Sequence, residues 1–146
     1  MKRWHLVAVG RLKQPDFKQA VTRYEERLSP WCRIDTVELK DQGPEVEATR
    51  QLEWIARCPV GGIVLTEHGQ AYDSQQFARL VESLPSGSVW LLGGANGFID
   101  HVRASARHQV SLSPLTFPHD LARVVLYEQW YRAHTLLAGH PYHRAG

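Results

Sequence analysis

The chain has 146 residues, a length typical of one domain that is large enough to bury a substantial core. Hydrophobic residues make up 43% of it and charged residues 22%, a composition that indicates a globular protein and excludes a disordered chain. The net charge of +2 is too small to indicate nucleic-acid binding from bulk electrostatics alone.

Helices and strands are predicted to alternate along the whole chain. An apolar run at 4–9 ends at Gly10 and indicates a buried strand, and apolar residues at 15–28 recur at helical spacing behind Pro15. In chain order, the predicted elements are strand 4–9, helix 15–28, strand 34–39, helix 45–56, strand 62–65, helix 74–84, strand 88–92, helix 99–106, strand 109–112 and helix 120–137. This pattern predicts an α/β fold, with a mostly parallel sheet covered by helices on both faces. Because no repeat or linker interrupts it, residues 1–146 are expected to form a single domain.

Three loops follow the carboxyl ends of predicted strands, at 66–73, 93–98 and 113–118. Ligands of open α/β sheets bind beyond these ends. The paired glycines of the second loop would let its backbone approach a ligand closely, although a tight strand-to-helix turn explains them equally well. The first strand is followed by one glycine, Gly10, where a Rossmann dinucleotide site needs three, so that class of site is excluded.

The loop after Leu65 contains an acid and an imidazole, Glu67 and His68. A metal site is not expected here, because His68 has no second ligand at helical or hairpin spacing. We interpret both side chains as solvent-exposed loop residues. Leu65 and Gly69, which lie at the turn itself, are expected to line a pocket.

The helix predicted at 120–137 is apolar around most of its circumference. A helix of this kind is buried on both sides, which in a protein of this size favours a subunit interface and therefore a homodimer. His119 and Arg123 share one helix face because they are four residues apart. Glu128 is placed to pair with Arg123 or Arg132, and ordinary helix ion pairs are the alternative to a functional role for these residues.

The chain closes with His140-Pro-Tyr-His-Arg144, a cluster of ring nitrogens, a phenol and a guanidinium. Free chain ends are normally small, polar and disordered, so we expect this terminus to fold back into a site.

Nothing in the sequence indicates a membrane or an oxidising compartment. The first apolar run is too short for a signal peptide, and no run approaches the length that spans a bilayer. The two cysteines, Cys32 and Cys58, have no metal or redox spacing. We therefore expect a cytoplasmic protein with no membrane partner.

Several blocks of the chain, taken together, resemble the RlmH family of the SPOUT methyltransferase superfamily, the bacterial 23S rRNA pseudouridine N3-methyltransferases. The similarity extends over essentially the whole chain and is most specific in the last third. The matching blocks are Leu6–Gly10, Leu65–Gly69, Gly93–Gly97, Thr116-Phe-Pro-His119, Arg123-Val-Val-Leu126, Glu128-Gln-Trp-Tyr-Arg-Ala133 and Pro141-Tyr-His-Arg144.

The resemblance implies a single-domain SPOUT fold with a C-terminal trefoil knot, an arrangement that alternation alone does not predict. It also implies a homodimer, 23S rRNA within the ribosome as substrate, and S-adenosylmethionine, without a metal, as methyl donor. The implied donor-binding residues are Leu65, Gly93, Leu112, Ser113, Pro114, Leu115, Thr116 and Phe117.

On the acceptor side, methyl transfer to N3 of the base requires removal of a proton, and we assign His143 as the base or as the group that orients it. Tyr142 and Arg132 complete the expected catalytic set, and Arg123, His140 and Arg144 are expected to contact RNA. We expect one subunit's tail to meet the donor bound by its partner. The alternatives are a non-catalytic ribosome-binding SPOUT protein and a SPOUT methyltransferase that acts on tRNA.

Overall fold

A computed structural model describes residues 1–142, and all ten expected elements are present in it. Their bounds differ from the predicted ones by a few residues, except at the third strand. In chain order they are β1 (Lys2–Val9), α1 (Pro15–Leu28), β2 (Cys32–Leu39), α2 (Pro44–Arg57), β3 (Ile63–Ala71), α3 (Ser74–Ser83), β4 (Val89–Leu92), α4 (Asp100–Ser105), β5 (His108–Ser111) and α5 (His119–Ala138).

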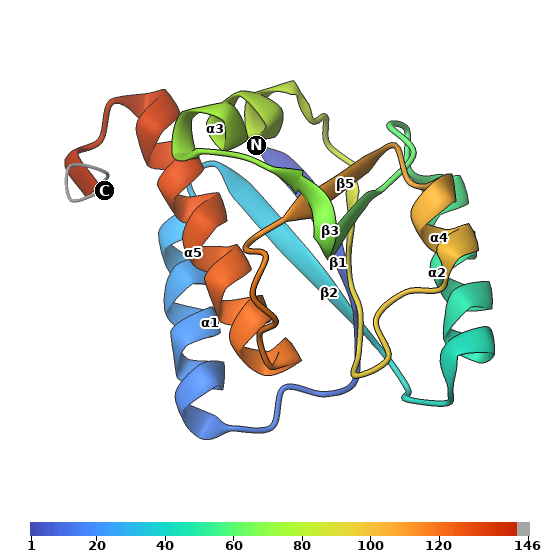
Figure 1. The fold of residues 1–146 in the computed structure, drawn as a ribbon. Helices are drawn as coiled ribbons and strands as arrows, with labels where there is room; N and C mark the ends of the chain where they lie inside the picture. Colours follow the sequence, from blue (N-terminus) through green and yellow to red (C-terminus); the bar gives the residue numbers. More distant parts are fainter. Residues whose placement is uncertain (143–146) are drawn as a thin grey trace.

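The strands form one five-stranded sheet in the order β2-β1-β4-β3-β5, and every pair in it is parallel (Figure 1). This confirms the predicted α/β architecture. The sheet brings the carboxyl ends of β4, β3 and β5 to the same edge, so the loops that follow these strands lie close together. The expected trefoil knot stays a prediction.

The third strand is longer than its apolar run suggested. It pairs with β5 through Ile63–Leu65, loses register, and pairs again through Gln70 and Ala71, so residues 66–69 form a bulge and not a free loop. Gly69 is required in this bulge, because a Cβ atom there would lie 2.6 Å from the backbone of Gln109. The expectation that Gly69 faces a pocket is therefore wrong.

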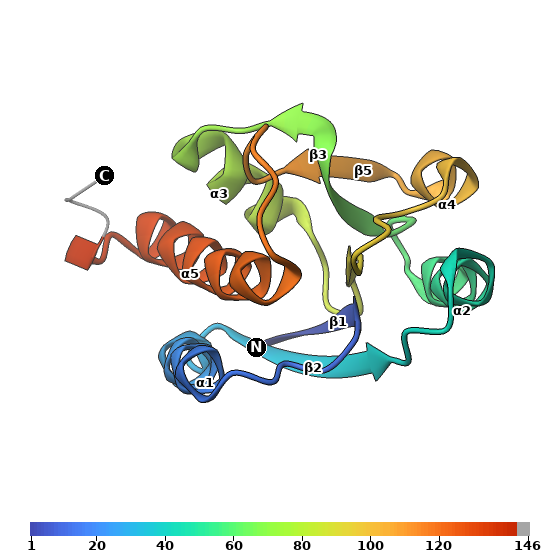
Figure 2. The ribbon, with the colours of Figure 1, turned by 60° about the horizontal axis from the view of Figure 1, so that its bottom comes forward.

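Helices cover both faces of the sheet unequally. Figure 2 shows α1, α3 and α5 on one side and α2 with the short α4 on the other. Alternate residues of β1 divide between the two cores, with Trp4, Leu6 and Ala8 on the first side and Val7 and Val9 on the second. This period of two is the pattern expected of a strand that is buried on both faces.

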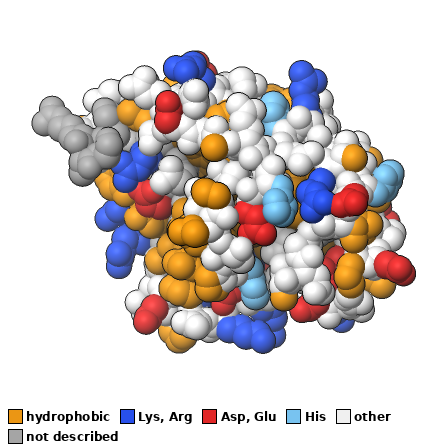
Figure 3. Space-filling model, viewed as in Figure 1, with side chains coloured by type: hydrophobic (Ala, Val, Ile, Leu, Met, Phe, Trp, Pro, Cys, Tyr) orange, Lys and Arg blue, Asp and Glu red, His pale blue; other side chains and the backbone are white. Residues whose placement is uncertain are grey.

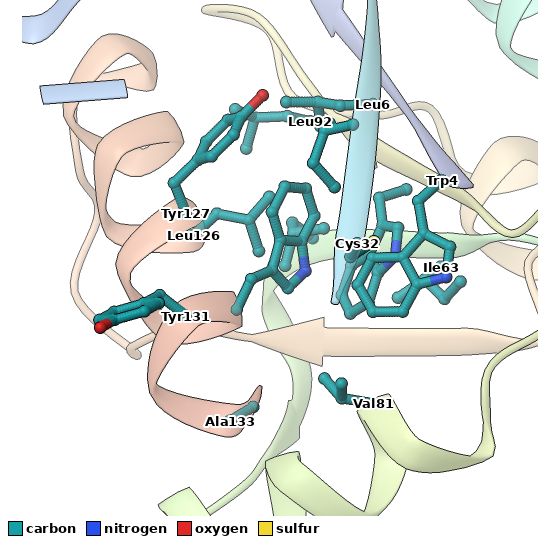
Figure 4. Close-up of a cluster of buried hydrophobic side chains, with 14 of the residues drawn as sticks. Trp4, Leu6, Cys32, Ile63, Val81, Leu92, Leu126, Tyr127, Tyr131 and Ala133 are labelled. Atoms are coloured by element: carbon teal, nitrogen blue, oxygen red, sulfur yellow. The ribbon is translucent and has the colours of Figure 1, made fainter. Parts of the chain in front are cut away.

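Three indole rings lie at the centre of the larger core, from β1, β4 and α5. The ring centroids of Trp4 and Trp90 are 5.4 Å apart, those of Trp90 and Trp130 are 5.2 Å apart, and all three side chains are fully buried. Tyr127 packs edge-on against Trp130 at 5.0 Å, and Figure 4 shows Tyr127 and Leu126 reaching from α5 into this cluster. These contacts attach α5 to the sheet.

The apolar circumference of α5 is explained largely within one chain, because the helix packs against the sheet side of the core and against both α1 and α3. A partner subunit is therefore not needed to bury Trp130 or Tyr131. One face of α5 remains only half-buried. This outward stripe consists of Leu121, Val124, Val125, Glu128, Gln129, Arg132 and Leu136.

Within residues 1–142, no helix combines the length and the apolar character needed to cross a membrane.

Candidate functional site

A cavity of about 690 Å³ lies where the loops after β4 and β5 meet the bulge of β3 and the first turn of α5. This size is typical of a small-molecule site. Seven of the eight expected donor-binding residues line it: Leu65, Gly93, Leu112, Ser113, Leu115, Thr116 and Phe117. Pro114, the eighth, is exposed and is not part of the lining.

The glycine-rich loop contributes mainly backbone to the cavity wall. Gly97 has a φ of 64°, and its N–H donates to the Gly94 carbonyl at 3.0 Å, which closes a tight turn. A Cβ on Gly94 would lie 2.9 Å from Val9, and one on Gly93 would lie 3.2 Å from the Gly97 carbonyl and the Phe98 ring. Glycines are needed here because the turn is packed against its neighbours. Since they have no side chains, the backbone of the loop faces the cavity.

Glu67 and His68 both line the cavity, a role that the sequence does not indicate. The Thr116 hydroxyl donates to Oε2 of Glu67 at 2.9 Å, so this bond joins the β3 bulge to the loop after β5. The Nε2 atom of His68 lies 3.8 Å from Oε1 of the same carboxylate. The two bonded residues are far apart in sequence, and no local pattern indicates that they meet.

Two further ionisable side chains, His119 and Arg103, line the cavity. The Nε2 atom of His119 lies 3.2 Å from Oδ1 of Asp120. Arg103 pairs with Asp100 and donates to the Phe98 carbonyl at 3.2 Å. The guanidinium thus holds the end of the glycine-rich loop and has its charge balanced by Asp100.

Arg123 does not lie at the surface, which contradicts its assignment to RNA binding. Its side chain is 4% exposed, it donates to Oε2 of Glu38 at 2.7 Å, and a second nitrogen donates to the Gly10 carbonyl at 3.3 Å. The same Glu38 oxygen accepts the Leu12 N–H at 3.1 Å. This ion pair therefore joins α5, the end of β2 and the loop after β1, next to the helix turn that lines the cavity.

The pKa of Glu38 reflects this pairing. Partial burial alone would raise it, but the hydrogen bonds from Arg123 and from the Leu12 N–H, with the charges of Arg123 and Arg11, hold the pKa of Glu38 below its ordinary value. The ionised form of Glu38 is therefore more stable in the folded chain than in the unfolded chain, so its ionisation stabilises the fold.

A second polar cluster lies around Glu128, in the middle of α5, and includes Tyr142 from beyond the end of the helix. Arg132 and the Tyr142 hydroxyl both donate to Oε2 of Glu128 at 2.9 Å, and the Arg132 guanidinium lies 5.3 Å from the centre of the Tyr142 ring. Burial, with the nearby Tyr24 hydroxyl and Glu128 carboxylate, raises the pKa of Tyr142 above its ordinary value. Tyr142 therefore stays protonated near neutral pH and acts as a hydrogen-bond donor.

The structure brings Arg132 and Tyr142 together, but it separates them from the cavity of the same chain. Arg132 lies ten residues beyond Ala122, the last cavity-lining residue of α5, which corresponds to about 15 Å along a helix. His140 is exposed, and its Nδ1 accepts the Tyr142 N–H at 3.1 Å. His143 and Arg144 lie outside the described residues.

Among residues 1–142, no three His, Cys, Asp or Glu side chains form a group that could hold a metal ion.

The chain is similar to known proteins over nearly its full length. A family model described as "Predicted SPOUT methyltransferase" matches residues 2–143. A relative from Gluconacetobacter diazotrophicus is 42% identical over 149 residues, covering 97% of each chain, and one from Nitratidesulfovibrio vulgaris (strain DP4) is 39% identical over 154 residues, covering 98% of this chain and 99% of its own. Both are named ribosomal RNA large subunit methyltransferase H.

Solved structures with little sequence similarity share the fold. A probable methylase family protein from Haemophilus influenzae superposes with a TM-score of 0.56 at 6% identity, covering 96% of this chain and 69% of its own. AviRb from Streptomyces viridochromogenes, a SpoU methyltransferase solved in complex with the cofactor AdoMet, superposes with a TM-score of 0.51 at 13% identity, covering 92% of this chain and 60% of its own.

The Arg123–Glu38 pair generates a prediction about stability. We expect Arg123→Ala to lower the free energy of unfolding by about 2 kcal/mol at pH 7, less than for a fully buried pair because Glu38 remains a third exposed. As the pH falls below the ordinary glutamate pKa of about 4.5, the parent should lose the contribution of ionised Glu38 to the free energy of unfolding. The variant should lose less stability over the same pH range, because it lacks the arginine that pairs with Glu38. Urea unfolding at several pH values measures both effects.

The matched control is Arg79→Ala, which removes an exposed arginine from α3. Equal losses in the two variants would contradict a special role for the buried pair.

Proposed function

The chain belongs to the SPOUT methyltransferase family, and from this premise we propose that it transfers a methyl group from S-adenosylmethionine to the RNA of the large ribosomal subunit. The observation that carries the proposal is the cavity of about 690 Å³ at the carboxyl ends of the strands, in a chain that aligns from end to end with relatives named for this reaction. The finer assignment is to N3 of a pseudouridine in 23S rRNA. Such a substrate implies a cytoplasmic enzyme.

The cavity suits the donor in size and in chemistry. Its walls are largely backbone and apolar side chains, which match the nucleoside and the methylene groups of the donor, and the glycines at 93, 94 and 97 keep the loop backbone close to the bound group. When bound, S-adenosylmethionine supplies an electrophilic methyl group. The chain's own task is to hold donor and acceptor in line and to exclude water from between them.

The acceptor side is assigned to the polar cluster around Glu128 and to the tail. Arg132, held in place by Glu128, offers a fixed guanidinium for a phosphate or a base carbonyl. Tyr142 remains a hydrogen-bond donor and orients the acceptor. His143 receives the N3 proton, and Arg144 with His140 contacts RNA phosphates.

The separation of about 15 Å between this cluster and the cavity supports a site built from two subunits, in which the tail of one chain meets the cavity of the other. The half-buried apolar residues at the start of the outward stripe of α5, Leu121, Val124 and Val125, offer a surface for this contact. Figure 3 shows hydrophobic side chains gathered over α5 and α1 on this face of the molecule. We therefore propose a homodimer.

The proposal is tested by mass spectrometry of ribosomal RNA. Deletion of the gene should remove one methyl group from one pseudouridine of 23S rRNA, and the intact gene should restore it. A gene that ends after Tyr142 should fail to restore it, because the proposed proton acceptor is lost, while the encoded protein still binds S-adenosylmethionine within a few-fold of the parent.

Each other outcome has a definite meaning. Loss of a methyl group from tRNA would favour the alternative tRNA enzyme, and unchanged RNA would favour a non-catalytic ribosome-binding protein. Full restoration by the shortened gene would show that residues 143–146 take no part in catalysis.

The packing of Gly93 generates a prediction about donor binding. We expect Gly93→Val to abolish detectable binding of S-adenosylmethionine, because the branched side chain would collide with Gly97 and Phe98 and displace the loop. Gly93→Ala should weaken binding less, since only a shift of a few tenths of an ångström is needed. Calorimetric titration measures affinity, and circular dichroism checks the fold. If the valine variant bound S-adenosylmethionine with normal affinity, this loop would not be part of the donor site.

The dimer prediction needs a substitution that leaves the monomer core intact. Val125→Asp places a charge on the half-buried stripe of α5 and should convert the dimer to a folded monomer that no longer methylates RNA. Trp130→Glu is unsuitable as a test of the dimer, because Trp130 is buried within one chain and a charge at this position would unfold the monomer. Light scattering measures the mass. A parent that is monomeric at micromolar concentration would contradict the prediction.

A further inference from the structure

We propose that Glu67 makes the cavity favour the methyl donor over its demethylated product, S-adenosylhomocysteine. The inference rests on the proposed function, and it assigns to one side chain the task of distinguishing two ligands of nearly identical shape. The function of the site itself does not require this discrimination.

The two ligands differ in charge as well as in one methyl group. In the transfer, the bond between sulfur and the methyl carbon breaks while a bond between that carbon and N3 forms, and the electron pair of the broken bond stays on sulfur. N3 gives up its proton to a base. The sulfonium cation therefore becomes a neutral thioether, and the ligand loses one positive charge.

Most of the cavity wall consists of backbone and uncharged side chains, so its interaction with the ligand depends little on the ligand's charge. Glu67 is the one carboxylate among the described lining residues. Arg103, the lining guanidinium, is already paired with Asp100 and bound to the Phe98 carbonyl. Glu67 is therefore the side chain that can distinguish the charged donor from its neutral product.

The carboxylate is fixed in position by the opposite wall. The Thr116 hydroxyl donates to Oε2 at 2.9 Å, which holds the carboxylate against the loop that follows β5. A charge that is already oriented does not have to reorganise when a cation arrives. Its effect is moderate, because 39% of the side chain remains exposed and water screens it.

This arrangement would keep the donor bound before the reaction and would loosen the product after it. The reaction itself removes the charge on which the extra affinity depends. Product release would thus be coupled to methyl transfer without a conformational change.

The test is calorimetric titration of the full-length protein with each ligand separately, at pH 8. Glu67→Gln keeps the hydrogen-bond acceptor for Thr116 but removes the charge. We expect it to weaken binding of S-adenosylmethionine by about three- to tenfold and to leave binding of S-adenosylhomocysteine within about twofold. Thr116→Val should reduce the preference partly, and Thr116→Ser should restore it.

Glu53→Gln is the matched control, because it removes the same charge from an exposed position on α2 outside the cavity. It should leave both affinities unchanged. Equal losses for both ligands in Glu67→Gln would show that the residue only supports the loop, and no loss for either would exclude any role in binding; either result overturns the inference. A parent protein that binds neither ligand would instead overturn the proposed function.

Discussion

The packing of three indole rings, from Trp4, Trp90 and Trp130, is the interaction on which the rest of the site depends. It fixes α5 against the inner strands β1 and β4 of the sheet, in a core where close packing permits few alternative positions. The first turn of that helix contributes His119 and Ala122 to the cavity, and its later turns present Arg132. One packing arrangement therefore sets both the donor side, at the first turn of α5, and the proposed acceptor side, on later turns of the same helix.

The sequence allowed the elements and the sheet class to be predicted because these depend on short-range patterns. Apolar residues run without interruption from Leu6 to Val9 because β1 is buried on both faces, and Asp73 caps α3 through a reciprocal bond with Gln76, a signal confined to four residues. The resemblance, carried by blocks along the whole chain, likewise pointed to the family and to seven of the residues that line the cavity.

The interactions that escaped prediction join residues distant in sequence. Thr116 and Glu67 are 49 residues apart, and Arg123 and Glu38 are 85 apart. Nothing local distinguishes an arginine that pairs in the interior from one that faces a ligand, so Arg123 was assigned to RNA although it stabilises the fold. Glu67 was set aside for the opposite reason, because a charged residue in a polar loop is usually solvated. Both errors come from the absence of tertiary information in a single sequence.

The irregular pairing of β3 has a consequence for the local stability of the sheet. Residues 66–69 bulge away from the ladder between two segments that remain paired with β5, and Glu67 lies within this stretch. Opening the bulge breaks few backbone bonds, so it costs far less free energy than unfolding the strand. We therefore expect the amide hydrogens of this segment to exchange with solvent before those of the ladder on either side.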